Sequence, residues 1–122
     1  MQKTAVRSSA VLTTSYVVGN KVTADGNVNQ LVLSVNFTKG SLTSGEIKVE
    51  LSYDDTDYLR EQNASVSSGT STLSDNEYTF TTTGKKQILI PLAGAAYIKV
   101  YAKGTGTVTD SLMAIDAYTV KV

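Results

Sequence analysis

Three carboxylates lie within four consecutive positions of the segment "LSYDDTDYL", residues 51 to 59. They belong to Asp54, Asp55 and Asp57, and a tyrosine flanks them on each side. Hard oxygen ligands grouped in this way suit Ca²⁺, so the three aspartates are a candidate metal site. Paired carboxylates also serve glycosidases. A third interpretation is a tight turn, because Asp and Thr side chains hydrogen-bond to their own backbone in turns.

The surrounding sequence favours the turn over the two chemical interpretations. An EF-hand loop counted from Asp55 needs Gly at its sixth position and Glu at its twelfth, where this chain has Arg60 and Val66. Glycosidase clefts are usually rimmed by aromatic residues, and the chain contains no tryptophan. We therefore expect a structural turn, with a bound cation as the alternative and catalysis as the least favoured reading.

No other motif predicts an enzyme or a cofactor. The chain has neither His nor Cys, which excludes Ser-His-Asp and Cys-His nucleophiles and ordinary zinc sites. The segment "TTTGKK", residues 81 to 86, has the Gly-Lys pair of a phosphate-binding loop. That loop also needs an earlier Gly and a following Ser or Thr, where this chain has Thr79 and Lys86. A turn between two strands is the simpler interpretation.

Length and charge narrow the class of protein further. A chain of 122 residues corresponds to one domain. Eleven basic residues balance eleven acidic ones, which removes the usual electrostatic argument for nucleic acid or an anionic membrane as a partner. No apolar run approaches the roughly 18 residues of a membrane helix. Polar residues 13 to 15 interrupt the apolar part of the amino terminus, so we expect no signal peptide and synthesis in a cytoplasm.

The elements that must position these residues are strands. The chain has 17 Thr and 13 Ser but one Pro, and its apolar residues recur with a period of two. The pattern predicts an all-β fold: a single antiparallel β-sandwich, Ig-like or jelly-roll-like, of about seven to eight strands over residues 10–122. The main expected strands cover residues 10–18, 30–38, 46–53, 77–82, 86–93, 97–104 and 111–122.

The same alternation predicts which residues are buried and which segments are irregular. Residues 1–9 are expected to be a flexible N-terminal arm, and the polar residues 60–74 a long surface loop. A change of phase near Asp116 predicts a bulge in the last strand. The core is expected to contain Leu33, Val35, Val49, Leu51, Ile90 and Val100.

Two outward rows are candidate interfaces. Thr79, Thr81 and Thr83 form one row, and Tyr97 with Tyr101 forms the other; both offer hydrogen-bonding or aromatic surface of the kind enriched at interfaces, or plain solvated sheet. The expected edge strand at residues 10–18 lacks the Pro or dense charge that guards an exposed edge. We therefore expect a partner, most simply another copy in a symmetric homo-oligomer.

The segment "LSYDDTDYLREQ" resembles the "S-x-D-G-T-x-W" turn of small β-sandwich proteins encoded among the structural genes of tailed bacteriophages. Ser52, Asp54 and Thr56 match in type; Asp55 stands where Gly is usual, and Tyr58 where Trp is usual. Residues 84–118 are also similar to that family. They contain its Gly-led strand, its "G-x-x-Y-[IV]-[KR]-V" strand and its "G-T-G-T-V-T" hairpin. The resemblance covers about half of the chain.

This resemblance implies a non-enzymatic virion protein that contacts copies of itself and other virion proteins, such as the major capsid or tail protein. A capsid decoration or head accessory protein is the first expectation, located in the virion after synthesis in the host cytoplasm. The alternative is a tail or host-surface module that binds carbohydrate, because exposed tyrosines could stack on sugar rings. The tyrosines available for such stacking are Tyr53, Tyr58, Tyr97 and Tyr101.

Overall fold

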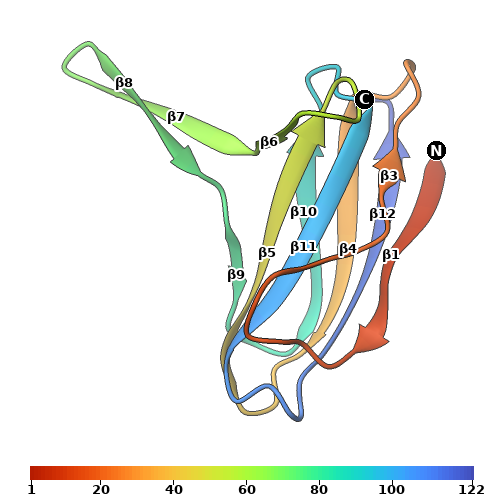
Figure 1. Cartoon of the computed structure of the whole chain (residues 1–122), viewed down its shortest axis with the longest axis vertical. Coiled ribbons are helices and arrows are strands. Elements are labelled where there is room, and N and C mark those ends of the chain that lie inside the picture. Colours follow the sequence, from red (N-terminus) through yellow and green to blue (C-terminus); the bar gives the residue numbers. More distant parts are fainter.

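The computed structural model describes all 122 residues and consists of strands, turns and loops. Two antiparallel sheets pack face to face, and a separate hairpin projects from one side (Figure 1). The predicted all-β sandwich is therefore confirmed. None of the chain forms a helix long and apolar enough to cross a membrane.

The first sheet has four strands. The second has six, but two short strands follow one another along each of its edges, so it is also four strand positions wide. The first sheet has the order β1 (Gln2–Ala10), β12 (Leu112–Val120), β4 (Gln30–Thr38), β10 (Gly84–Pro91). At the centre of the second sheet lie β11 (Tyr97–Gly106) and β5 (Leu42–Ser52). Two short strands share each of its edges: β2 (Val17–Val18) and β3 (Val22–Thr23) on β11, β6 (Tyr58–Arg60) and β9 (Tyr78–Phe80) on β5. The sandwich thus has eight strand positions.

The core lies between the two sheets and follows the predicted alternation. Leu31, Leu33, Val35 and Phe37 of β4 are fully buried, while the residues between them face outward. Five of the six predicted core residues are buried, namely Leu33, Val35, Val49, Ile90 and Val100. Leu51 is only half-buried. The alternation of β5 changes phase at its end, because Ser52 turns inward to hold the following turn and Tyr53 is exposed.

Residues 1–9 were expected to be a flexible arm, and this expectation is wrong. Residues 2 to 10 form β1, which pairs along β12. Val6 anchors the strand in the core, and the Arg7 side chain donates a hydrogen bond of 3.0 Å to the carbonyl of Met113. The register shifts between Ala5 and Arg7, opposite Asp116. The irregularity expected near Asp116 therefore lies in the partner strand, where one extra residue is accommodated as a bulge.

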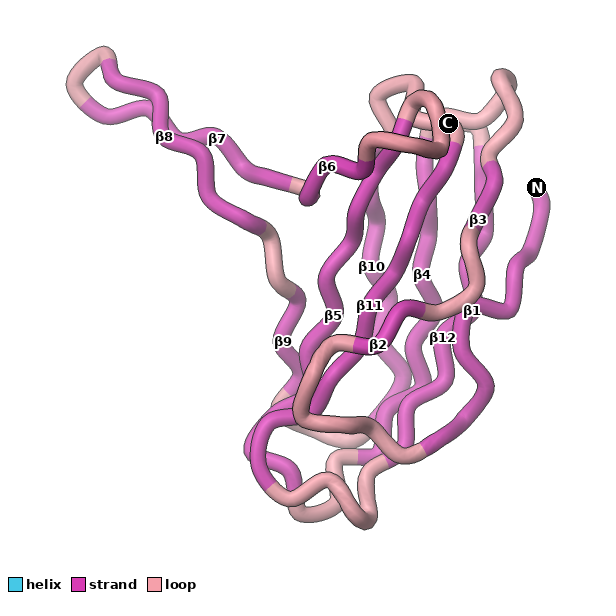
Figure 2. Tube along the Cα trace, viewed as in Figure 1, coloured by secondary structure: helices cyan, strands magenta, loops and turns pink.

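The expected first strand at residues 10–18 is largely a crossing segment. Residues 11 to 16 leave the first sheet and reach the second, where only Val17 and Val18 pair with β11 (Figure 2). Leu12 is buried, and the carbonyl of Thr13 accepts a hydrogen bond of 2.8 Å from the Gly104 amide. These contacts hold the segment across the open end of the sandwich.

The polar stretch expected to be a loop is instead a hairpin. β7 (Gln62–Ser67) pairs with β8 (Thr70–Asp75), and these two strands form a sheet of their own. Ser68 and Gly69 connect them with positive φ angles of 51° and 78°. Two positive φ angles are what a tight two-residue hairpin turn requires. The hairpin extends away from the sandwich (Figures 1 and 2).

Candidate interaction surfaces

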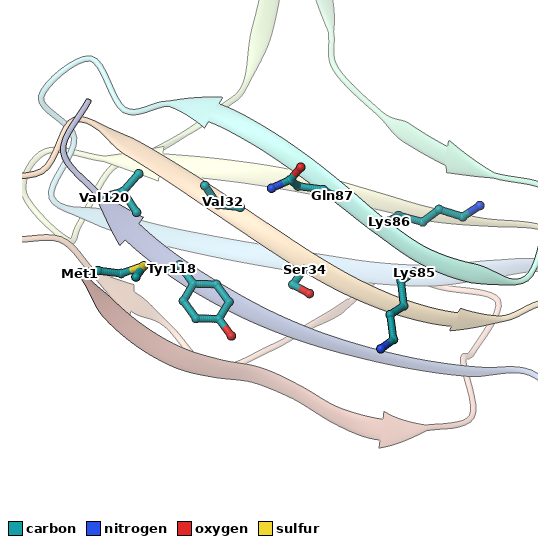
Figure 3. Close-up of a pocket in the computed structure, with 8 residues that line it drawn as sticks. All are labelled: Met1, Val32, Ser34, Lys85, Lys86, Gln87, Tyr118 and Val120. Carbon is teal, nitrogen blue, oxygen red and sulfur yellow. The ribbon is translucent and has the colours of Figure 1, made fainter.

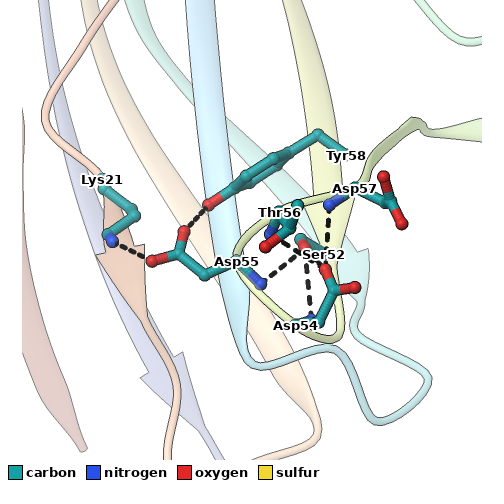
Figure 4. Close-up of polar contacts among 7 residues, drawn as sticks. All are labelled: Lys21, Ser52, Asp54, Asp55, Thr56, Asp57 and Tyr58. Atoms are coloured by element: carbon teal, nitrogen blue, oxygen red, sulfur yellow. Dashed lines mark hydrogen bonds and ion pairs between the residues drawn. The ribbon is translucent and has the colours of Figure 1, made fainter.

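The aspartate-rich segment is a turn closed by its own side chains. The Ser52 hydroxyl accepts backbone N–H bonds of 3.3 Å from Asp54 and 2.9 Å from Asp55. The Asp54 carboxylate accepts two more, each 2.9 Å long, from the amides of Thr56 and Asp57 (Figure 4). Asp55 has a φ of 63°, a left-handed conformation that Asp tolerates better than most residues. The turn interpretation is confirmed.

The three candidate metal ligands point in different directions (Figure 4). The Asp55 carboxylate contacts the ammonium of Lys21 at 2.6 Å and accepts a hydrogen bond from the Tyr58 hydroxyl. Asp54 is directed into its own turn, and Asp57 turns away. No group of three or more acidic side chains in the chain is arranged to hold a metal ion. The geometry therefore offers a cation no shared set of ligands at Asp54, Asp55 and Asp57.

Hydrogen bonding stabilises the charged form of three aspartates. The amides of Asp57 and Thr56 lower the pKa of Asp54. The hydrogen bond from Lys21 lowers the pKa of Asp55. At the other end of the sandwich, the amide and hydroxyl of Ser41 lower the pKa of Asp110. Each of these carboxylates titrates at lower pH in the folded chain than in the unfolded chain.

We expect this difference to make the fold sensitive to acid. A carboxylate with a lowered folded pKa contributes its stabilisation above the unfolded value of about 3.9, and this is lost as the pH falls through the folded pKa. The melting temperature should therefore change little from pH 7 to pH 5 and fall below about pH 4. Asp54→Asn and Asp110→Asn should each reduce that fall, as measured by thermal unfolding followed by circular dichroism.

Asp57→Asn is the matched control for this experiment, because the Asp57 carboxylate accepts no hydrogen bond within the chain. Its melting curve should keep the same dependence on pH as the wild type. An acid-induced fall that is identical in the wild type, Asp54→Asn and Asp110→Asn would show that these turns do not account for the acid sensitivity.

The outer side of the second sheet is covered by alternating tyrosines and lysines, which we call the tyrosine–lysine face. The ammonium of Lys48 lies 4.6 Å from the ring centre of Tyr101 and 4.9 Å from that of Tyr16. The ammonium of Lys99 lies 4.1 Å from the ring centre of Tyr58. Cation–π attraction favours these positions. The other members of the face are Lys21, Tyr97 and Lys103.

The tyrosine hydroxyls of this face are also engaged within the chain. Tyr101 donates a hydrogen bond of 2.8 Å to Glu50, and Tyr58 donates to Asp55. Burial, followed by these hydrogen bonds, raises the pKa of both tyrosines to about 12. Both hydroxyls therefore remain protonated donors at neutral pH. A sugar ring that stacked on Tyr58 or Tyr101 would compete with the lysine already placed over it.

Of the predicted interface rows, the tyrosines lie together and the threonines do not. Tyr97 and Tyr101 both face outward from β11, as expected. Thr79 lies in β9, but Thr81 and Thr83 follow the end of that strand. β9 ends at Phe80, which turns inward to pack against the core, and the chain then turns into β10. Thr83 accepts a backbone hydrogen bond from Lys39 and so belongs to the turn.

The hairpin has an apolar face that the sequence reasoning missed. Ala64 lies opposite Leu73, and Val66 is on the same side of the two-stranded sheet, which also carries Gln62, Ser71 and Asp75 at its margins. Val66 is 71% exposed and Leu73 63% exposed. The residues of the opposite face are Asn63, Ser65, Ser67, Thr70, Thr72 and Ser74, all polar. The alternation of residues 62 to 66 could have revealed this strand, but its small side chains weaken the signal.

The second missed feature is a groove on the outer side of the first sheet. It has a volume of about 530 Å³ and crosses β12, β4 and β10 (Figure 3). Its charged side chains are two lysines, and it contains no acidic one. The residues that line it are Met1, Val32, Ser34, Lys85, Lys86, Gln87, Tyr118 and Val120.

Comparison with known proteins adds no family to these observations. The sequence matches no protein-family model, and a search of curated proteins finds no match. The surfaces that bear on function are therefore the chain's own: the tyrosine–lysine face, the two-faced hairpin and the lysine-lined groove.

Proposed function

We propose that this chain is a non-enzymatic structural protein of a tailed-bacteriophage virion, with capsid decoration or head accessory protein as its role. It acts in many copies, through contacts with itself and with a larger shell. The observation that carries the proposal is the projecting hairpin. All twelve strand residues of β7 and β8 are exposed, although Ala64, Val66 and Leu73 gather on one face.

An exposed hairpin of this kind is suited to contact another molecule. Two-stranded hairpins are marginally stable alone in water, and ordering their backbone costs roughly 1–2 kcal/mol per residue. The sandwich core does not offset that cost, because the hairpin side chains lie outside it. A partner surface that covers Val66 and Leu73 would supply the missing burial. Exposed apolar groups gathered on one face are a feature of protein interaction sites.

The sheet edges support the same proposal. β1 forms one edge of the first sheet, where Asn20 binds only the carbonyls of Ala5 and Val6, and β10 forms the other edge. Exposed strand edges present unpaired N–H and C=O groups to neighbouring chains. Each edge strand carries two charged residues, Lys85 and Lys86 in β10 and Lys3 and Arg7 in β1, but only β10 also has a proline. The resemblance of the Ser52–Tyr58 turn to those of small phage sandwiches points to the same class of protein.

Binding to isolated phage parts tests the proposal. Heads and tails are purified separately from a tailed phage that carries the gene for this chain, after that gene has been deleted. The labelled protein is added in increasing amounts, and the bound fraction is measured by sedimentation through a cushion. We expect saturation on heads at a fixed ratio to the major shell protein. Failure to bind either heads or tails would contradict the virion role.

A glycan array measured with the same labelled protein addresses the carbohydrate alternative. A shell protein should give no signal there. Glycan binding that is lost in Tyr97→Ala and Tyr101→Ala, together with no binding to heads, would favour the host-surface module. The tyrosine–lysine face is the surface that such a module would use.

A further inference from the structure

We infer that the β7–β8 hairpin of one copy docks, apolar face inward, in the lysine-lined groove of a second copy of this chain. The inference names a partner for the hairpin and rests on the proposed assembly role. It follows from three properties that the two surfaces share: complementary apolar groups, complementary charge and matching size.

The apolar groups of the two surfaces complement each other. The hairpin presents Ala64, Val66 and Leu73 on one face, and nothing in its own chain covers them. The groove presents Val32, Tyr118 and Val120 from neighbouring strands, with Met1 at one end (Figure 3). Val32 lies directly opposite Tyr118, so these side chains form a continuous apolar floor. Burying both surfaces together removes apolar area from water on each side.

The charges are also opposite in sign. The β7–β8 hairpin contains one acidic residue, Asp75, and no basic one, whereas the groove is lined by two lysines and no acidic residue. Asp75 lies on the same face of the hairpin as Leu73; its side chain is 54% exposed, and the Arg60 guanidinium of the same chain lies 3.7 Å from it. Docking the apolar face therefore brings an acidic side chain toward Lys85, which lies on the outer side of β10 with Gln87. Such complementarity favours this pairing over like-charged alternatives.

The length of the hairpin and the direction in which it projects favour docking on a second copy over docking on the groove of the same chain. Six strand residues span about 20 Å, which is enough to cross the roughly 15 Å between the outer strands of a four-stranded sheet. The hairpin leaves the β5 edge of the second sheet and points away from the sandwich, while the groove lies on the outer side of the first sheet (Figures 1 and 3). Each copy carries one hairpin and one groove. Reciprocal docking closes a dimer, and head-to-tail docking builds a ring or a repeating array.

Sedimentation velocity over a concentration series tests the docking. Leu73→Asp, on the apolar face, should weaken self-association at least tenfold. Thr72→Asp is the matched control, because it places the same charge on the opposite face of the same hairpin and should change association less than twofold. Lys85→Glu should weaken association, and combining it with Asp75→Lys should restore it. A monomeric wild type, or equal effects of Leu73→Asp and Thr72→Asp, would overturn the docking.

Cysteine trapping identifies the contacting surfaces, because the natural chain contains no cysteine. An equimolar mixture of Leu73→Cys and Gln87→Cys chains should form a mixed disulfide dimer under mild oxidation, and Thr72→Cys with Gln87→Cys should form much less. A chain that carries both Leu73→Cys and Gln87→Cys and closes within itself at high dilution would show that the hairpin folds onto its own groove, and would overturn the inference.

Normal head binding by Leu73→Asp would leave the proposed function standing without this docking. Formation of the mixed disulfide by a protein that does not bind heads would support the docking and contradict the proposed function.

Discussion

Replacing Phe37 by alanine should lower the free energy of unfolding by about 3–5 kcal/mol, the range found for buried aromatic residues. Phe37 is the largest fully buried side chain, and its ring centre lies 5.8 Å from that of Phe80. It belongs to β4, which is paired on both sides and cannot shift easily to fill a cavity. Single domains are stable by only about 5–15 kcal/mol, so this loss is a large part of the total. Urea unfolding followed by circular dichroism measures it.

Leu89→Ala is the matched control for Phe37→Ala. Leu89 belongs to the neighbouring strand β10 but faces outward and is 54% exposed. Its truncation should cost less than about 1 kcal/mol, because little of the side chain is buried in the core. Similar losses for Phe37→Ala and Leu89→Ala would contradict the assignment of the inner and outer sides of the first sheet.

Strands with one buried face were predictable from the sequence. The expected strand at residues 30–38 has the bounds of β4, because its apolar residues alternate without interruption. A shift of one residue would expose Leu31, Leu33, Val35 and Phe37 together, so the pattern admits one register. The prediction failed at the end of β5. Ser52 is buried there for its hydrogen bonds to the turn, and periodicity does not reveal such a role.

Segments whose stability depends on distant contacts were not predictable in the same way. β1 has one fully buried residue, Val6, and its pairing is set by β12, more than 100 positions away in the chain. The hairpin residues are small and polar, so their composition suggested a loop. In our proposal another chain covers the apolar face of the hairpin, and a contact with another chain leaves no periodic pattern in a single sequence.

Among the candidate sites, too, contacts between neighbouring residues were predictable and contacts between distant residues were not. The aspartate turn was predictable because the hydrogen bonds of Ser52 and Asp54 join residues at most three positions apart. The contact between Lys21 and Asp55 joins residues 34 positions apart and required the fold. Alternation placed Tyr97 and Tyr101 on one face. The lysine over Tyr101 comes from β5, and only the register between β5 and β11 brings it there.

Gly45→Val should destabilise the centre of the sandwich. Gly45 lies in β5 and is buried, and a Cβ atom there would come within 2.7 Å of Cε1 and 2.9 Å of Cζ of Phe37. The ring cannot retreat freely, because Phe80 packs against it and Met113 lies on the same side of the glycine. We expect a loss of about 1–3 kcal/mol, typical of overpacking in a dense core. Gly26→Val is the control, since open space surrounds that glycine.

The steric origin of this loss is tested by combining Gly45→Val with Phe37→Leu. If the valine is destabilising because it meets the aromatic ring, a smaller side chain at position 37 should relieve part of the clash. The double variant should then be more stable than the sum of the two single losses implies, by about 0.5–3 kcal/mol of coupling. Additive losses would mean that Gly45 is required for a backbone reason. The φ angle of Gly45 is not among the positive values that favour glycine, so we expect the coupled result.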